Sequence, residues 1–276
     1  MRPNVLAAFL GVLAVSAHAA EPPLDRATVL VVAGAPGEAE FASVFENEAK
    51  VWKGLGALAG AQLLAIGTDP AGTTSDRERL KELLAAEPKD GPGEFWIVLA
   101  GHGTFDGSEA KFNLRGPDVT AGDLAEWLRP FHRPLAIIDT SSSSAPFLTK
   151  LAGANRAVVT STRSGFEQNY SRFGTYFAEA MADPGSDLDK DGQVSLLEAF
   201  LSAARRTTEF YKTEGRLATE HALLDDNGDG LGTPAEWFKG VRATKQAKEG
   251  ASLDGTRANQ FSLVRSAAEQ QLTPEV

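Results

Sequence analysis

Oxygen-bearing side chains in one short segment are spaced as ligands of a hard divalent cation. The segment runs from Asp187 to Glu198, with carboxylates at its first, third, fifth and twelfth positions and Gly192 at the sixth. Calcium takes roughly six to eight oxygen ligands, and a loop of this spacing supplies them around a sharp turn at its sixth position. We predict that this segment, called loop one, binds Ca²⁺ through Asp187, Asp189, Asp191, the backbone carbonyl of Gln193, Ser195 and Glu198. The alternative is an acidic surface turn before a helix, where carboxylates are also favourable.

A second segment, called loop two, repeats this pattern from residue 225 to residue 236. It departs at the eighth position, which holds Gly232, and Pro234 alters the exit from the loop. The predicted Ca²⁺ ligands are Asp225, Asn227, Asp229, the backbone carbonyl of Leu231, Thr233 and Glu236. The alternative is an Asx-rich structural turn. Both loops resemble the calcium loop of the EF-hand, but residues 183–186 interrupt the approach to loop one, so we predict EF-hand-like loops rather than a full EF-hand domain.

A histidine and a run of serines each follow an apolar stretch closely. His102, flanked by Gly101 and Gly103, follows the stretch 95–100, and Ser141 follows the stretch 135–138. A serine hydroxyl becomes a nucleophile when a histidine accepts its proton and a third group orients that histidine. The alternatives are a glycine-flanked turn without a catalytic role and a polar loop that caps a helix beginning near residue 146.

These residues depend on a succession of strands and helices for their position. Apolar runs predict strands over 28–33, 61–66, 95–100, 135–138 and 157–160. Helical spacing or a capping box predicts helices over 38–55, 75–86, 120–128 and 173–181. Strands that are apolar throughout, alternating with helices, indicate an α/β fold with a parallel sheet covered on both faces. Sites in such sheets lie at the carboxyl ends of strands, where His102 and Ser141 both fall.

The character of the chain changes after about residue 183. Leu197, Phe200, Leu201, Ala204 and Tyr211 form one helical stripe between the two acidic loops. We therefore predict an α/β domain over 20–182, a mostly helical EF-hand-like calcium-binding module over 183–250, and a C-terminal tail over 251–276 with an edge strand at 261–264.

The order of strands and the two short motifs resemble the caspase–legumain clan of cysteine peptidases, over roughly residues 27–181. In that clan one apolar strand ends in His-Gly and another ends in Asp/Glu-x-Cys-x-Ser-Gly. The resemblance implies a three-layer, caspase-like, mainly parallel sheet with helices on both faces. It also implies that His102 is the catalytic base and that the N–H of Gly103 is an oxyanion donor. By the same resemblance Ser141 stands at the nucleophile position, and residues 160–164 form the wall of the substrate pocket.

Two positions depart from the clan's pattern, because Ser141 replaces the nucleophilic cysteine and Ser144 replaces a glycine. The chain contains no cysteine at all. A serine hydroxyl does not ionise beside a histidine as a thiol does, and the clan's catalytic dyad has no orienting acid. We therefore expect a catalytically inactive pseudopeptidase that binds a protein or peptide. The alternatives are a serine-type hydrolase or peptidase with a Ser141–His102 dyad and a purely structural, calcium-stabilised protein.

The first residues have the pattern of a secretory signal. Arg2 precedes an apolar stretch from residue 5 to residue 15, and Ala17-His18-Ala19 matches a cleavage site. This stretch is too short to cross roughly 30 Å of hydrocarbon, so we expect a signal peptide over 1–19 and no membrane anchor in the mature chain. The protein would then be exported to the periplasm or the extracellular space. The net charge of −10 argues against a nucleic-acid partner, which calls for basic patches.

Overall fold

The structure is a computed structural model that describes residues 25–271. The predicted signal peptide over 1–19 lies outside the described residues. None of the helices within residues 25–271 has the length and apolar character needed to cross a bilayer.

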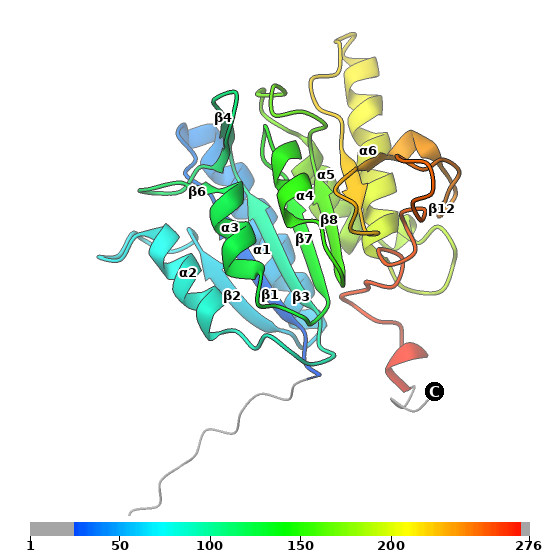
Figure 1. The fold of residues 1–276 in the computed structure, drawn as a ribbon, viewed down its shortest axis with the longest axis horizontal. Coiled ribbons are helices and arrows are strands. Elements are labelled where there is room, and N and C mark those ends of the chain that lie inside the picture. Colours follow the sequence, from blue (N-terminus) through cyan, green and yellow to red (C-terminus); the bar gives the residue numbers. More distant parts are fainter. Residues whose placement is uncertain (1–24, 272–276) are drawn as a thin grey trace, which may run out of the picture.

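One seven-stranded sheet forms the centre of the molecule, with the strand order β10-β9-β8-β7-β3-β1-β2 (Figure 1). Its members are β1 (Thr28–Ala33), β2 (Gln62–Ile66), β3 (Phe95–Ala100), β7 (Leu135–Asp139), β8 (Arg156–Thr160), β9 (Leu223–Asp225) and β10 (Thr233–Pro234). The first five strands are parallel, whereas β9 and β10 run antiparallel to their neighbours. Every residue of β1, β3 and β7 is buried, and these strands are apolar except for Thr28 and Asp139, as expected for strands covered on both faces.

Helices cover both faces of this sheet, as Figure 1 shows. One face carries α1 (Ala39–Leu58), α5 (Phe173–Ala182) and α6 (Leu196–Thr213), whose Trp52, Phe177 and Phe200 share one core cluster. The other face carries α2 (Asp76–Ala86), α3 (Ala121–Leu128) and α4 (Ala145–Leu151), which pack into a second cluster. Alternate residues of β1 divide between the two clusters, so this strand contributes to both layers of the core. The predicted three-layer α/β architecture is confirmed.

Local sequence signals place two helix starts correctly. Ser75 and Glu78 form a capping box at the start of α2, and Thr120 and Asp123 form another at the start of α3. The sequence did not predict the short strands β4 (Gly103–Phe105), β5 (Ala110–Phe112) and β6 (Val119–Thr120), which form a small sheet after β3. It also did not predict β11 (Phe238–Lys239), β12 (Arg242–Ala243) or the 3₁₀ turns η1 (Pro184–Ser186), η2 (Ala235–Trp237) and η3 (Glu269–Gln271).

The C-terminal part of the chain is built into the same sheet and core, rather than forming a module apart from the α/β domain. Strand β9 pairs with β8, with Val159 opposite Leu224, and α6 packs against α5 within one core cluster. The predicted edge strand at 261–264 is not formed. Phe261 and Leu263 are nevertheless buried, and the carbonyl of Phe261 accepts a hydrogen bond from the N–H of Leu196 at 2.8 Å. This segment is held by its side chains and by isolated hydrogen bonds, without a strand ladder.

Candidate functional site

The two resemblance motifs come together at the carboxyl ends of neighbouring strands, because β3 pairs with β7. Their closest polar contact joins Gly103 to Ser142. The N–H of Gly103 donates to Ser142 Oγ at 3.3 Å, and Ser142 Oγ–H donates to the carbonyl of Gly103 at 3.0 Å. A Cβ at position 103 would lie 2.1 Å from the carbonyl oxygen of Ser142, so only glycine allows this approach. The predicted oxyanion donor is therefore already engaged within the protein.

The His102 ring lies in an aromatic surrounding and makes its polar contact away from the serine run. Its Nε2 atom lies 3.2 Å from the carbonyl oxygen of Pro36. The rings of Phe41 and Phe45 meet it edge-on, with centroid distances of 4.7 and 5.1 Å. Within residues 25–271 no hydrogen bond joins His102 to Ser141.

Ser141 is bound to an acid instead of a base. Its side chain is completely buried, its Oγ–H donates to Asp139 Oδ1 at 2.6 Å, and its N–H donates to the same oxygen at 3.0 Å. Asp139 Oδ2 is buried without a hydrogen-bond partner among the described residues. Burial raises the pKa of Asp139 to about 7, although the hydrogen bonds from Ser141 act in the opposite direction. The hydroxyl at the nucleophile position is thus enclosed and already a donor.

The rest of the serine run is covered by the segment 160–167. The N–H of Ser143, whose φ is 58°, donates to the carbonyl of Glu167 at 2.9 Å. Ser144 Oγ accepts hydrogen bonds from the N–H groups of Ser161 and Thr162 at 3.1 and 3.2 Å. Two residues of the predicted pocket wall, Ser161 and Thr162, therefore lie directly against Ser144, whereas the hydroxyl of Ser143 is buried without a hydrogen-bond partner among the described residues.

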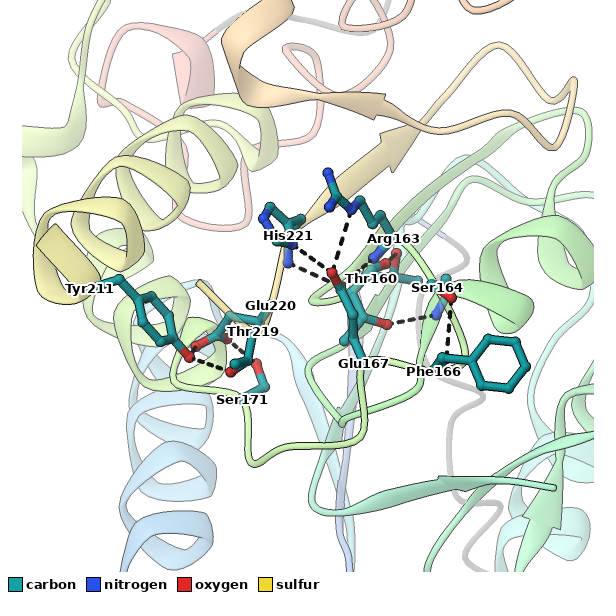
Figure 2. A network of polar contacts seen from close by, with 12 residues as sticks. Thr160, Arg163, Ser164, Phe166, Glu167, Ser171, Tyr211, Thr219, Glu220 and His221 are labelled. Carbon is teal, nitrogen blue, oxygen red and sulfur yellow. Dashed lines mark hydrogen bonds and ion pairs between the residues drawn. The ribbon is translucent and has the colours of Figure 1, made fainter. Parts of the chain in front are cut away.

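Two further acids hold this covering segment and the residues that follow it in place (Figure 2). Glu167 pairs with the His221 ring, with 2.5 Å between Oε1 and Nδ1, and its Oε2 accepts from the N–H of Arg163 at 3.0 Å. Glu220 is buried and accepts hydrogen bonds from Ser171 Oγ at 2.6 Å and from the N–H of Phe173, the first residue of α5, at 3.0 Å. No sequence motif marked these residues, since the pairing of β8 with β9 brings them together from distant parts of the chain.

The enclosed serine predicts that the protein is inert toward an active-site reagent. We expect incubation with a serine-reactive fluorophosphonate to leave Ser141 unmodified, because its hydroxyl is buried and donates to Asp139 rather than to a base. Intact-mass spectrometry checks this outcome, with an active serine hydrolase in the same buffer as the control. A covalent adduct that disappears in both Ser141→Ala and His102→Ala would establish the serine-type hydrolase instead.

Three carboxylates of loop one lie close enough together to hold a cation. Carboxylate oxygens of Asp187, Asp189 and Asp191 all lie within 4.8 Å of one another, a spacing that fits oxygen ligands at about 2.3–2.6 Å from a shared Ca²⁺. Glu198 lies in the first turn of α6, where its Oε1 accepts from the N–H of Leu188 at 2.6 Å. Burial raises the pKa of Asp191, and repulsion from Asp189 and Glu198 acts in the same direction. A cation between these carboxylates would relieve that repulsion.

Loop two repeats the hydrogen-bond frame of loop one. In loop one Asp187 accepts through Oδ1 from the N–H of Lys190 at 2.6 Å and through Oδ2 from the N–H of Gly192 at 3.1 Å. In loop two Asp225 accepts in the same way from Gly228 at 2.8 Å and Gly230 at 2.6 Å. The fourth and sixth positions have positive φ in both loops. The remaining predicted oxygen ligands belong to the same two loops, Gln193 and Ser195 to loop one and the others to loop two: Asn227, Asp229, Leu231 and Thr233.

The twelfth position is where the two loops differ. In loop one, the carboxylate of Glu198 accepts from the N–H groups of the second and third residues through Oε1 and from the ninth residue's Ser195 Oγ through Oε2. In loop two Glu236 is exposed beside α6 and makes no hydrogen bond to any described loop residue.

Asp254 has the corresponding contacts in loop two. Its Oδ1 accepts from the N–H groups of Asp226 and Asn227 at 2.9 and 3.1 Å, and its Oδ2 accepts from Thr233 Oγ1 at 2.6 Å. Burial raises the pKa of Asp254 to about 7, and the charge of Asp226 adds to this effect. The sequence pattern missed Asp254, because this residue lies outside the twelve-residue loop and the segment that joins it to Glu236 does not have the spacing of calcium ligands.

Comparisons with known proteins identify the fold. The sequence matches no family profile, and no curated protein matches it. Among solved structures, the initiator caspase Dronc of Drosophila has a TM-score of 0.51 and 15% identity, with 75% of this chain and 81% of that chain covered. Caspase-1 from Spodoptera frugiperda has a TM-score of 0.45 and 8% identity, with 74% of this chain and 87% of that chain covered. Protein GSU0716 from Geobacter sulfurreducens has a TM-score of 0.40 and 12% identity, with 66% of this chain and 89% of that chain covered. The protein has a caspase-like α/β fold, as the two motifs implied.

Proposed function

We propose that this chain is an exported, calcium-binding protein of caspase-like fold that holds a protein or peptide ligand without cleaving it. The observation that carries the calcium proposal is the recurrence of one hydrogen-bond frame in two loops that both have calcium-ligand spacing. The enclosed Ser141 and the separate contact of His102 support the absence of cleavage. Export rests on the signal-like sequence at residues 1–19, and peptide binding rests on the likeness of fold alone.

Calcium fits the donors because both loops offer oxygen ligands only. Loop one would hold the ion through its four carboxylates, the hydroxyl of Ser195 and the backbone carbonyl of Gln193. Loop two would use Asp225, Asn227 and Asp229, with Asp254 in the place that Glu198 has in loop one. Glu236, the ligand expected from the sequence, has no part in this set.

Calcium is therefore expected to raise the melting temperature. An ion that binds only the folded loops stabilises the protein by about 2.7 kcal/mol at a hundredfold excess over Kd. For a chain of this length, that corresponds to a rise of about 5–10 °C per occupied loop. Differential scanning fluorimetry in excess Ca²⁺ or in chelator measures the shift.

Two controls sharpen this melting experiment. Asp187→Ala removes the first ligand of loop one and should reduce the shift without abolishing it, since loop two is intact. Mg²⁺ prefers a compact octahedron and should give a smaller shift than Ca²⁺ at equal concentration. A melting temperature that is the same in millimolar Ca²⁺ and in chelator would refute the calcium proposal.

A further inference from the structure

A cavity of about 610 Å³ lies between α1 and α5, on the face of the sheet opposite α2, α3 and α4. Apolar and aromatic side chains form much of its lining: Phe41, Val44, Val51, Tyr170 and Tyr176. Cavities of this size and character are typical of sites for small molecules or for single side chains of a larger ligand. Neither the calcium loops nor the serine run contributes to the lining.

A buried carboxylate faces this cavity without a full set of partners. Glu48 lines the cavity and is only 5% exposed, and its Oε1 accepts from Thr175 Oγ1 at 2.9 Å. Its Oε2 accepts no hydrogen bond from any residue within 25–271, and no lysine or arginine in that range forms an ion pair with it. Buried carboxylates are normally paired with a cation or saturated with hydrogen bonds. Accordingly, burial raises the pKa of Glu48 to about 7.

The other charged groups of the lining leave Glu48 uncompensated. Glu179 is ion-paired with Arg206, and Glu40 is exposed. Arg172 is the only cation among the described lining residues, and its guanidinium stacks on the ring of Phe210 at 4.2 Å. The lining therefore has an excess of negative charge around an apolar interior.

We propose that this cavity binds an alkylammonium group, in which the cation pairs with Glu48 Oε2 and the methylene stem packs on the apolar walls. An ammonium group brings three donors, and Asn47 and the Tyr170 hydroxyl offer further acceptors in the same lining. Burial and the charge of Glu48 raise the pKa of Tyr170 to about 12, so this hydroxyl stays neutral while Glu48 ionises to meet the cation. The group can be a free amine or the lysine side chain of a peptide.

The cavity is adjacent to His102, which supplies a spectroscopic reporter. Phe41 and Tyr170 line the cavity and also meet the His102 ring, with centroid distances of 4.7 and 6.2 Å. A ligand that packs on these two rings will change the shielding of the His102 ring protons. This inference does not depend on calcium binding or on the absence of peptide cleavage.

Calorimetric titration with three probes tests the inference: n-hexylammonium, an acetylated and amidated pentapeptide with central lysine, and the same peptide with norleucine. Norleucine keeps the apolar stem and removes the charge. We expect the lysine peptide or the amine to bind at least tenfold more tightly than the norleucine peptide and to shift the His102 ring protons. Binding of the amine alone indicates a small-molecule ligand, whereas binding of the lysine peptide indicates a peptide ligand.

Matched variants test whether the carboxylate of Glu48 binds the cationic probe. Glu48→Gln keeps the shape of the side chain and should weaken binding of the cationic probe at least tenfold. Glu46→Gln makes the same charge change at an exposed position of α1 outside the cavity lining, and it should leave binding within twofold. The inference is overturned when neither cationic probe binds at millimolar concentration, when norleucine binds as well as lysine, or when both variants behave alike. The first two outcomes need only the wild-type protein. The calcium-induced melting shift of Glu48→Gln should equal that of the wild type, which separates this test from the calcium proposal.

Discussion

Replacing Asp254 by asparagine is expected to lower the Ca²⁺ affinity of loop two at least about tenfold, or about 1.4 kcal/mol. The variant removes the carboxylate whose contacts match those of Glu198 in loop one. The calcium affinity of such loops depends strongly on the number of charged ligands. The hydrogen-bond frame of the loop is kept in this variant, since the amide oxygen can accept from the N–H groups of Asp226 and Asn227 while the amide nitrogen donates to Thr233 Oγ1.

The measurement requires loop two to be titrated alone. Asp187→Ala provides that background in the full chain, and isothermal calorimetry then compares the added changes Asp254→Asn and Glu236→Gln. Glu236→Gln removes the same charge from the residue that the sequence pattern favours, and it should leave the affinity unchanged because this side chain is exposed beside α6. If Glu236→Gln lowers the Ca²⁺ affinity and Asp254→Asn does not, then Glu236 is the twelfth ligand, as the sequence pattern predicts.

The second large effect concerns pH and the buried acid below Ser141. An aspartate with a pKa of about 7 in the folded state and an ordinary pKa of 3.8 in the unfolded state binds more protons when folded, between those two values. The free energy of unfolding therefore falls as the pH rises from about 4 to about 7, by roughly 4 kcal/mol at most for this one group. The contribution is fully present below pH 4 and is lost above pH 7.

Asp139→Asn removes this titration and isolates it from the other acids. We expect the difference in melting temperature between the variant and the wild type to change by several degrees between pH 5 and pH 8, in favour of the variant at the higher pH. The experiment is run in chelator, so that calcium loops do not contribute. A difference that does not vary with pH would show that Asp139 is ionised in the fold at acidic pH. Thr140→Ser, one residue away and uncharged, is the control.

Strands β1 and β3 could be predicted from the sequence because both are enclosed on both faces. Strands β1 and β3 are uninterrupted apolar runs, and the structure begins and ends them at the predicted residues. The short strands β9 and β10 escaped prediction, since two or three residues carry no periodicity and β10 includes Pro234. The apolar pattern at 261–264 predicted a strand where the structure has irregular backbone. Phe261 and Leu263 are apolar because they are buried in the core, and burial does not require a strand.

The candidate site shows a similar limit. The clustered carboxylates of loop one could be predicted because Asp187, Asp189 and Asp191 are close neighbours in the sequence. Asp254, in contrast, reaches loop two from a distant segment. Glu220 and Glu48 carry no motif, and only the packing of α5 against neighbouring elements gives them their surroundings. The sequence motifs placed His102 and Ser141 on adjacent strands, but they could not indicate that Ser141 is a donor to Asp139.

The hairpin of β9 and β10 also protects one margin of the sheet. Strand β8 is a five-residue stretch with two adjacent valines, and without β9 its backbone groups would be open to pairing with another molecule. Loop two is the turn of this hairpin, with Asp225 as the last residue of β9. Under the calcium proposal, an ion in loop two stabilises the β9–β10 hairpin that covers the edge of β8. Self-association into aggregates would then be suppressed wherever calcium fills loop two.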